Sequence, residues 1–372
     1  CLVAGSLAGC GKKTEEKVIK IGVFEPTTGE NGGGGFQEVL GIRYAREMHP
    51  TVTINGEEYQ VELVEVDNKS DKTEAVNAAQ KLVSEKVSVV LGSYGSGVSI
   101  AAGQIFADAK IPAIGCSCTN PQVTEGNDYY FRVCFIDPFQ GTVMANYAFQ
   151  NGAKSAAVIT QLGDDYSSGL GSFFKDAFAK LGGEIVSEEQ FQTNQTDFKA
   201  ILTNIKAANP DIILTPISIT TAPLIISRQG AWHYGNHRGR RYLGEFHHHR
   251  ERRQGRRGRC AFHLFDEAEP ANDEAAAFIK GFKEYLVKNK QEDIIPAVSA
   301  LGYDSYLAAI KAIETANSTD TTAIRDALKG VQIDGVTGSI TFNETGDANK
   351  DIAFIKTIKD GRFQFLTTTT VE

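Results

Sequence analysis

The sequence predicts an α/β protein with two similar lobes, each built on a mostly parallel sheet that helices cover on both faces. Strand-like and helix-like patterns alternate along the chain, and the same alternation restarts after Gly152. A length of 372 residues is enough for two domains of ordinary size. In open sheets of this kind, ligands bind at the carboxyl ends of the strands.

The first half of the chain alternates short apolar runs with longer amphipathic ones. Residues 71–85, for example, place Ala75, Ala79 and Leu82 on one helical face. We expect strands at 18–24, 59–66, 87–91 and 111–115, and helices at 36–48, 71–85 and 99–109. The loops at 93–96 and 116–120 follow two of these strands and are rich in Gly, Ser and Thr.

The second half repeats this rhythm. We expect strands at 156–160, 184–191 and 211–216, and helices at 169–181 and 198–208. The loop at 161–168 again carries Gly and Ser after a strand. The two halves therefore predict two lobes whose strand-end loops hold the candidate site.

The composition argues against several classes of function. The net charge of −8 is unlike that of a nucleic-acid-binding protein, and no apolar run reaches the roughly 20 residues that span a membrane. The sequence contains no Walker loop and no nucleophile elbow, and His49 is the one histidine outside an aberrant segment at 228–264. We therefore expect no enzyme, no cofactor and no metal site.

The first 17 residues resemble the end of a bacterial lipoprotein signal. Small residues precede Cys10 in Leu-Ala-Gly-Cys, and polar residues follow it. We expect Cys10 to be the lipidated residue, with the two or more acyl chains that stable anchoring needs; a chance cysteine is the alternative. Cys116, Cys118 and Cys134 are expected to be small buried residues, or at most one local disulfide.

Residues 228–264 break every pattern. They contain all histidines except His49, the single tryptophan Trp232 and many arginines, and hydrophobic periodicity disappears. A metal-binding cluster at 247–249 or a basic nucleic-acid patch would be the direct interpretation. We favour an out-of-frame translation, because codons for 242–251 read one base later can encode Thr-Trp-Glu-Asn-Ser-Thr-Ile-Ile-Glu-Asn. Sequencing the gene tests this hypothesis.

Several stretches carry a resemblance to one family. They are 71–83 (DKTEAVNAAQKLV), 118–121 (CTNP), 131–141 (FRVCFIDPFQG) and 164–170 (DDYSSGL). Together they look like the leucine/isoleucine/valine-binding protein family of ABC importers, over nearly the whole chain from Val18 apart from the aberrant segment. The resemblance implies a type I periplasmic binding protein: two Rossmann-like lobes, joined by a three-strand hinge, that close like a Venus flytrap.

The resemblance also implies domain boundaries. Residues 1–17 would be a signal remnant with the lipobox and a linker, 18–136 plus 266–335 the N-terminal lobe, and 137–265 plus 336–372 the C-terminal lobe. Crossovers between the lobes would lie near 135–137, 265 and 336–340. Helices around 274–287 and 301–316 would then belong to the N-terminal lobe.

Four ligand contacts follow from the same resemblance. Ser96 would offer its hydroxyl to the carboxylate of an amino acid, at a helix start whose dipole favours an anion. The Ser117 carbonyl and the Thr119 hydroxyl would accept the ammonium, and the Thr119 N–H would assist the carboxylate. Tyr166, on the second lobe, would close over the ligand. A helix cap at Ser96, a turn at 117–119 and an exposed loop tyrosine are the structural alternatives.

The sequence departs from the family at three places. Gly34 lies where an aromatic wall is common, and Ser218 where a second tyrosine is common. The acid that often pairs with the ammonium would fall near Arg240 and Arg241, which repel an ammonium. For the chain as written we therefore predict weak or absent amino-acid binding.

The function implied is that of a monomeric, extracytoplasmic solute-binding lipoprotein. It would capture a branched-chain or related amino acid and deliver it to ABC permease subunits in the membrane. A ligand-sensing receptor of the same fold, for amides or other small polar solutes, is the alternative. The identity of the amino acid depends on pocket walls that the sequence does not define.

Overall fold

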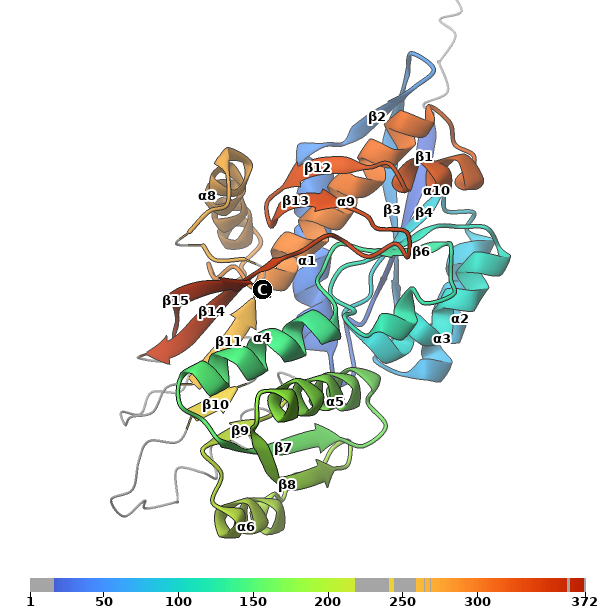
Figure 1. Ribbon diagram of the computed structural model, residues 1–372. Coiled ribbons are helices and arrows are strands. Elements are labelled where there is room, and N and C mark those ends of the chain that lie inside the picture. Colours follow the sequence, from blue (N-terminus) through green and yellow to red (C-terminus); the bar gives the residue numbers. More distant parts are fainter. Residues whose placement is uncertain are drawn as a thin grey trace, which may run out of the picture.

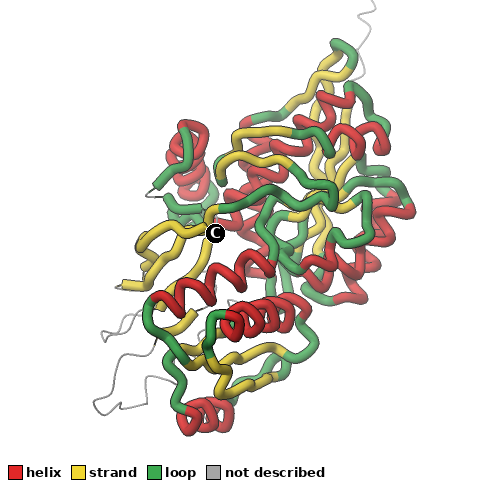
Figure 2. The backbone as a smooth tube through the Cα atoms, in the orientation of Figure 1, coloured by secondary structure: helices red, strands yellow, loops and turns green. Residues whose placement is uncertain are grey.

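The computed structural model describes residues 17–217, 241–243, 259–263, 265–267, 269–359 and 362–370. These residues form two lobes, each with its own sheet (Figure 1). Helices flank the strands in both lobes (Figure 2). The predicted α/β class, with two lobes and parallel-rich sheets, is confirmed.

The sheet of the N-terminal lobe has six strands in the order β2-β3-β1-β4-β5-β6. All neighbouring pairs are parallel except β2 and β3. That hairpin was not predicted, although its turn is Asn55-Gly56, both with positive φ, which is a strong hairpin signal. The strands are β1 (Val18–Glu25), β2 (Thr51–Ile54), β3 (Glu57–Asp67), β4 (Val89–Leu91), β5 (Ala113–Gly115) and β6 (Tyr130–Arg132).

Two separate hydrophobic clusters cover the two faces of this sheet. One face packs on α1 and α9, and the other on α2 and α3. Tyr44 on α1 contacts the rings of Phe278 and Phe282 on α8, which attaches that helix to the lobe. The helices are α1 (Gly32–Met48), α2 (Lys72–Ser84), α3 (Ser96–Asp108), η1 (Pro121–Val123), α8 (Asp273–Lys288), α9 (Ala297–Ala316) and α10 (Thr321–Leu328).

The sheet of the C-terminal lobe has the order β15-β14-β11-β10-β9-β7-β8. Its strands pair in parallel except at β14, which is antiparallel to both of its neighbours. The strands are β7 (Ser155–Gln161), β8 (Glu184–Phe191), β9 (Ile212–Leu214), β10 (Arg241–Leu243), β11 (Arg259–His263), β14 (Ile352–Lys359) and β15 (Arg362–Thr370), and the helices are α4 (Asp137–Gln150), α5 (Asp165–Lys180) and α6 (Lys199–Ala208).

The described part of the chain contains each strand and helix that the sequence predicts, and several of them begin at a different residue. The helices α1, α3 and α5 begin three or four residues early, at Gly32, Ser96 and Asp165, because polar or glycine-rich first turns conceal the apolar periodicity. Helix α4 was not predicted, although Asp137-Pro138 is a common helix start. None of the described helices has the length and apolarity that crossing a membrane requires.

The chain passes between the two sheets three times. The passages lie at 133–136, between β11 and α8, and between the hairpin of β12 (Gln332–Gly335) with β13 (Gly338–Thr341) and strand β14. On the last passage Asp347 forms a parallel bridge with Arg132 at the end of β6. The exact residues at which each lobe ends stay a prediction.

Candidate functional site

The carboxyl ends of β1, β4 and β5 lie at one edge of the N-terminal lobe, because these strands are parallel neighbours. Ser96 begins α3 at this edge and is 2% exposed. Its hydroxyl oxygen accepts a hydrogen bond of 3.2 Å from the backbone N–H of Asn120. The start of α3 is therefore joined to the loop that follows β5.

Thr119 lies in that loop and is 4% exposed. Its carbonyl accepts a hydrogen bond of 2.9 Å from the Asp137 N–H at the start of α4. Its hydroxyl is buried, and no described residue forms a hydrogen bond with it. A buried hydroxyl without a partner is costly, so this atom points to a ligand or a water molecule.

Ser117 is half-buried and begins the same loop. Its hydroxyl donates a hydrogen bond to Glu38, which comes from α1 and is 0% exposed. This contact turns the Ser117 hydroxyl toward the interior. The Ser117 carbonyl, which is predicted to accept the ammonium together with the Thr119 hydroxyl, thus belongs to a residue whose side chain is held by a buried acid.

Glu38 is one of two buried acids behind the strand ends. Glu25, the last residue of β1, is 1% exposed and accepts a hydrogen bond of 2.8 Å from the Tyr94 N–H. Burial, followed by the neighbouring Glu38, raises the pKa of Glu25 well above its usual range. Glu25, Glu38 and Cys116 each place one ligand atom within 4.8 Å of the others.

This cluster is the set of described residues best placed to hold a cation. Burial and the two acids raise the pKa of the Cys116 thiol well above its usual range. A protonated thiol is a poor metal ligand, since thiolates are the form that binds metals. The two buried acids and the thiol therefore favour protonated forms, and the two carboxyl groups can share a proton.

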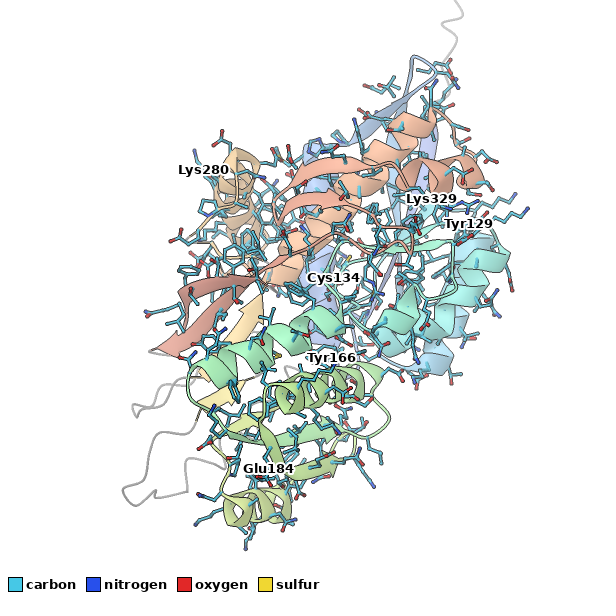
Figure 3. All side chains as sticks on the ribbon, in the orientation of Figure 1. Tyr129, Cys134, Tyr166, Glu184, Lys280 and Lys329 are labelled. Carbon is cyan, nitrogen blue, oxygen red and sulfur yellow. The ribbon has the colours of Figure 1, made fainter. Side chains whose placement is uncertain are left out.

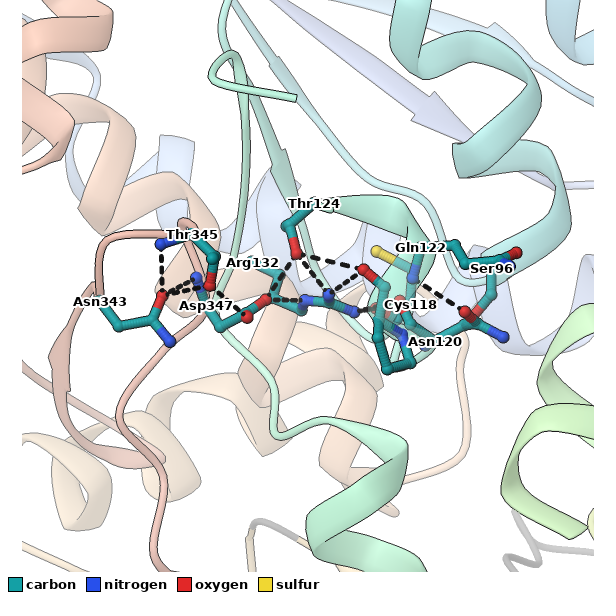
Figure 4. Close-up of polar contacts among 10 residues, drawn as sticks. Ser96, Cys118, Asn120, Gln122, Thr124, Arg132, Asn343, Thr345 and Asp347 are labelled. Atoms are coloured by element: carbon teal, nitrogen blue, oxygen red, sulfur yellow. Dashed lines mark hydrogen bonds and ion pairs between the residues drawn. The ribbon is translucent and has the colours of Figure 1, made fainter. Parts of the chain in front are cut away.

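A buried arginine, Arg132, holds the backbone of the loop that contains Thr119 (Figure 4). Arg132 is 0% exposed, and its Nε lies 2.6 Å from Asp347. Its guanidinium donates to the carbonyls of residues 118, 120 and 121, at 2.7, 2.7 and 3.3 Å, and to Thr124 at 2.7 Å. Arg132 thereby fixes the backbone on both sides of Thr119 and connects it to the third passage between the lobes.

The opposite lobe meets this loop at the start of α5, where Tyr166 lies half-buried (Figure 3). The Asn120 side chain donates a hydrogen bond of 2.8 Å to the carbonyl of Asp165. The Asp165 carboxylate pairs with Lys72 at 2.7 Å. Gln161, at the end of β7, donates to Glu30 at 2.9 Å, so the two lobes are in contact along this edge.

The start of α5 is built by local capping. Asp164 accepts a hydrogen bond of 2.6 Å from the Ser167 N–H. The Ser167 hydroxyl in turn contacts the N–H of Gln161 and the carbonyl of Pro216, which joins the ends of β7 and β9. Burial raises the pKa of Asp164 to about 6. These contacts fix the backbone immediately around Tyr166.

Tyr94 fills the place where Gly34 lacks a side chain. A Cβ atom on Gly34 would overlap the ring of Tyr94. The tyrosine ring therefore covers the first turn of α1, two residues before Ser96. Sequence reasoning missed Tyr94, although an aromatic residue within a Gly-Ser loop after a strand is an available signal.

The structure brings Ser96, Ser117 and Thr119 together on adjoining loops, with Tyr166 next to the Asn120–Asp165 contact. Their roles in ligand binding stay predictions. Cys10, Ser218 and Arg240 lie outside the described residues, and of Arg241 only the backbone in β10 is described. The buried polar residues Glu25, Glu38, Arg132 and Gln140 were missed, because burial of a charge leaves no trace in hydrophobic periodicity.

The three cysteines near the loop are free thiols and are at most 1% exposed. The expectation of small buried residues is confirmed, and a disulfide among Cys116, Cys118 and Cys134 is not formed. Burial raises the pKa of each thiol.

Comparison with known proteins identifies the family. The family model described as periplasmic binding protein matches residues 18–228 and 261–362. The Leu/Ile/Val-binding protein homolog 1 of Brucella melitensis is 30% identical over 197 residues, which are 52% of this chain and 53% of that protein. The matched part thus spans about half the length of this curated relative.

Solved structures match over much more of the chain. The leucine binding protein LivK from Thermotoga maritima is 32% identical and has a TM-score of 0.83, covering 95% of this chain and 99% of that one. LivJ from Streptococcus pneumoniae, solved with isoleucine, is 26% identical with a TM-score of 0.81, over 95% and 99%. This family and fold are those of extracytoplasmic, substrate-binding proteins of transporters rather than enzymes. The chain belongs to the periplasmic binding protein family.

Proposed function

We propose that this protein is the solute-binding lipoprotein of an ABC importer for branched-chain or related amino acids. The observation that carries this proposal is the convergence of Ser96, Ser117 and Thr119, on strand-end loops of one lobe, with Tyr166 on the other. Hydroxyls, main-chain groups and a helix start suit a zwitterion, which needs donors for its carboxylate and acceptors for its ammonium. The unpartnered Thr119 hydroxyl supplies one such acceptor.

The relatives support the choice of ligand. The Thermotoga protein is described as leucine binding, and the Streptococcus structure holds isoleucine. The present chain covers 99% of each. In this proposal Cys10 carries the lipid anchor, and the permease subunits in the membrane receive the amino acid from a monomeric binding protein.

Binding proceeds by hinge closure. The ligand docks first on the N-terminal lobe, where Arg132 holds the Thr119 loop in place. Closure then adds Tyr166 and forms the Lys72–Asp165 and Gln161–Glu30 contacts between the lobes. Contacts that exist only in the closed state shift the equilibrium toward it.

The segment at 228–264 bears directly on affinity. The family match stops at residue 228 and resumes at 261, which supports the proposal that this segment is translated out of frame. In the chain as written Arg240 and Arg241 stand where an acid is common in the family, so a ligand ammonium meets positive charge.

Calorimetry with L-leucine, L-isoleucine and L-valine tests the proposal on the chain as written and on a chain with 228–264 restored to the alternative frame. We expect micromolar or tighter binding by the restored chain, and weak or absent binding by the written one. Ser96→Ala and Thr119→Val should each weaken binding by about 10- to 100-fold, since each removes a charge-assisted hydrogen bond. Ser84→Ala, at an exposed position of α2, is the control. Absence of amino-acid binding by both chains would contradict the proposal.

A further inference from the structure

The site described above contains a feature that hydroxyls and capping do not explain: two carboxyl groups, Glu25 and Glu38, buried at 1% and 0% exposure behind the ligand loops. We propose that this carboxyl pair holds a single proton between its two members, and that its one negative charge selects ligands with an ammonium group. This inference rests on the proposed function and adds the basis of its selectivity.

The contacts of the pair define its charge. Glu38 accepts a hydrogen bond from the Ser117 hydroxyl, and Glu25 accepts one from the Tyr94 N–H. Donors directed at both groups favour ionised oxygens, whereas repulsion between adjacent carboxylates in a buried site opposes two negative charges. One shared proton satisfies both conditions, as in other carboxyl dyads.

The charge of the pair lacks compensation at Glu25. Burial has the largest effect on the pKa of Glu25, followed by Glu38, the Tyr94 N–H and Cys118. None of these groups is a cation. The second Glu25 oxygen is buried and receives no hydrogen bond from a described donor, so Glu38 is the described neighbour with which it can share a proton. A Cβ atom on Gly92 would lie 2.6 Å from this oxygen, so the carboxyl group is pressed against the loop after β4.

The place of the pair suits a zwitterion. Ser96 and the start of the 13-residue helix α3 provide the positive end of a helix dipole for a carboxylate. The carboxyl pair lies next to Ser117, at the start of the neighbouring loop, and provides a negative charge for the ammonium. In this loop Thr119 lies between Ser117, which contacts the carboxyl pair, and Asn120, whose N–H contacts Ser96. The buried hydroxyl of Thr119 has no described partner. A carboxylic acid without an ammonium group would meet the same negative charge, and this charge would not increase its affinity.

Glutamine variants test the proton count. In Glu25→Gln or Glu38→Gln the new amide donates the hydrogen bond that the shared proton supplied, so one negative charge remains. The double variant E25Q/E38Q removes it. Glu47→Gln, on the exposed side of the same helix α1, is the matched control.

Affinity for L-leucine and for 4-methylpentanoate, which lacks the ammonium group, is measured by calorimetry on each full-length variant. The parent for all of these variants is the chain with 228–264 restored to the alternative frame. We expect the preference for leucine to fall by about tenfold or more in the double variant, and to stay within about threefold of the parent in each single variant. Equal loss for both compounds, or an unchanged preference in the double variant, would overturn the inference.

Urea unfolding of the ligand-free protein at pH 7 gives a second readout that needs no binding. Removal of a buried, uncompensated charge should leave the midpoint of the double variant at or above that of the parent. A markedly lower midpoint would assign the pair a structural role and overturn the inference. If the chain with 228–264 restored binds neither compound, the proposed function fails, while the unfolding comparison still decides the charge of the pair.

Discussion

The two lobes differ in the chemistry of the edges that meet. The N-terminal edge contains fully buried charges: Arg132 is enclosed by acceptors, and Glu25 lies under the loops that carry Ser96 and Ser117. The C-terminal edge uses half-buried residues at a helix start, among them Asp164, which caps α5, and Asp165, which pairs with Lys72. We therefore expect the N-terminal edge to keep its shape before the ligand arrives and the C-terminal edge to adapt to it.

The N-terminal edge itself contains two contrasting buried charges. Arg132 has five hydrogen bonds, one of which is its ion pair with Asp347, so its charge is compensated. One buried Glu25 oxygen receives no hydrogen bond from a described donor other than its partner acid Glu38, and no cation is among the groups that most affect the pKa of Glu25. A compensated buried charge supports the fold, whereas an uncompensated one costs stability, which is why we propose that the ammonium of a ligand supplies the opposite charge at Glu25.

The largest effect is expected at Arg132. Arg132→Met should lower the free energy of unfolding by about 3–5 kcal/mol, since it leaves Asp347 and several carbonyls buried without a donor. Urea denaturation measures this loss. Arg43→Met, which breaks the half-exposed pair with Glu65, should cost less than about 1 kcal/mol. Similar losses for the two variants would remove the contrast between structural and surface arginines.

A smaller, pH-dependent effect is expected at the cap of α5. Burial raises the pKa of Asp164 to about 6, above the value of about 4 in an unfolded chain. Between these values the folded protein binds more protons than the unfolded one, so this residue adds stability as the pH falls from 6 to 4. Asp164→Asn keeps the cap and removes the charge.

We therefore expect Asp164→Asn to be more stable than the parent at pH 7.5, by about 1–3 kcal/mol. The advantage should shrink as the pH falls below 6 and approach zero only below about pH 4, where the parent carboxyl is protonated in both the folded and the unfolded state. Thermal unfolding at about pH 7.5 and about pH 3.5 measures it. Asp71→Asn, at the exposed cap of α2, is the control for replacing a cap carboxylate. An advantage that grows at low pH would contradict the assignment.

The smallest effect is expected at the ion pair that joins the lobes. The side chains of Lys72 and Asp165 are 55% and 30% exposed, so the pair contributes less than about 1 kcal/mol. Lys72→Met should raise the dissociation rate of a bound amino acid about two- to threefold at low salt and have no effect at 1 M NaCl. Lys69→Met, which breaks a pair within one lobe, is the control in stopped-flow measurements. An equal effect of both variants would show that the contact does not report on closure.

Most of the fold could be predicted because apolar periodicity marks it. The strand at 184–191 was predicted with its observed bounds, and most other elements within a few residues. Failures lie where first turns are polar or glycine-rich, as at Gly32 and Asp165. The hairpin at Asn55-Gly56 and the helix after Asp137 were also overlooked, although turn and cap signals mark both.

The site was only partly predictable. Ser96, Ser117, Thr119 and Tyr166 came from motifs in strand-end loops, where sequence and position coincide. Glu38 was not predictable, because it faces the interior from the middle of an ordinary helix 79 residues before its partner Ser117. Arg132 lies within the motif at 131–141, yet its burial and its role could not be predicted, because its partner Asp347 is 215 residues away. Such pairs depend on topology and not on local pattern.

The three buried thiols have a practical consequence. Cys116 and Cys118 lie in the loop that holds Thr119, Cys134 follows β6, and burial raises the pKa of each thiol. Oxidants and alkylating agents attack the thiolate, so these groups stay inert while the N-terminal lobe is intact, even in an oxidising compartment. The rate at which a maleimide modifies these three cysteines therefore reports how often this part of the N-terminal lobe opens, without an engineered labelling site.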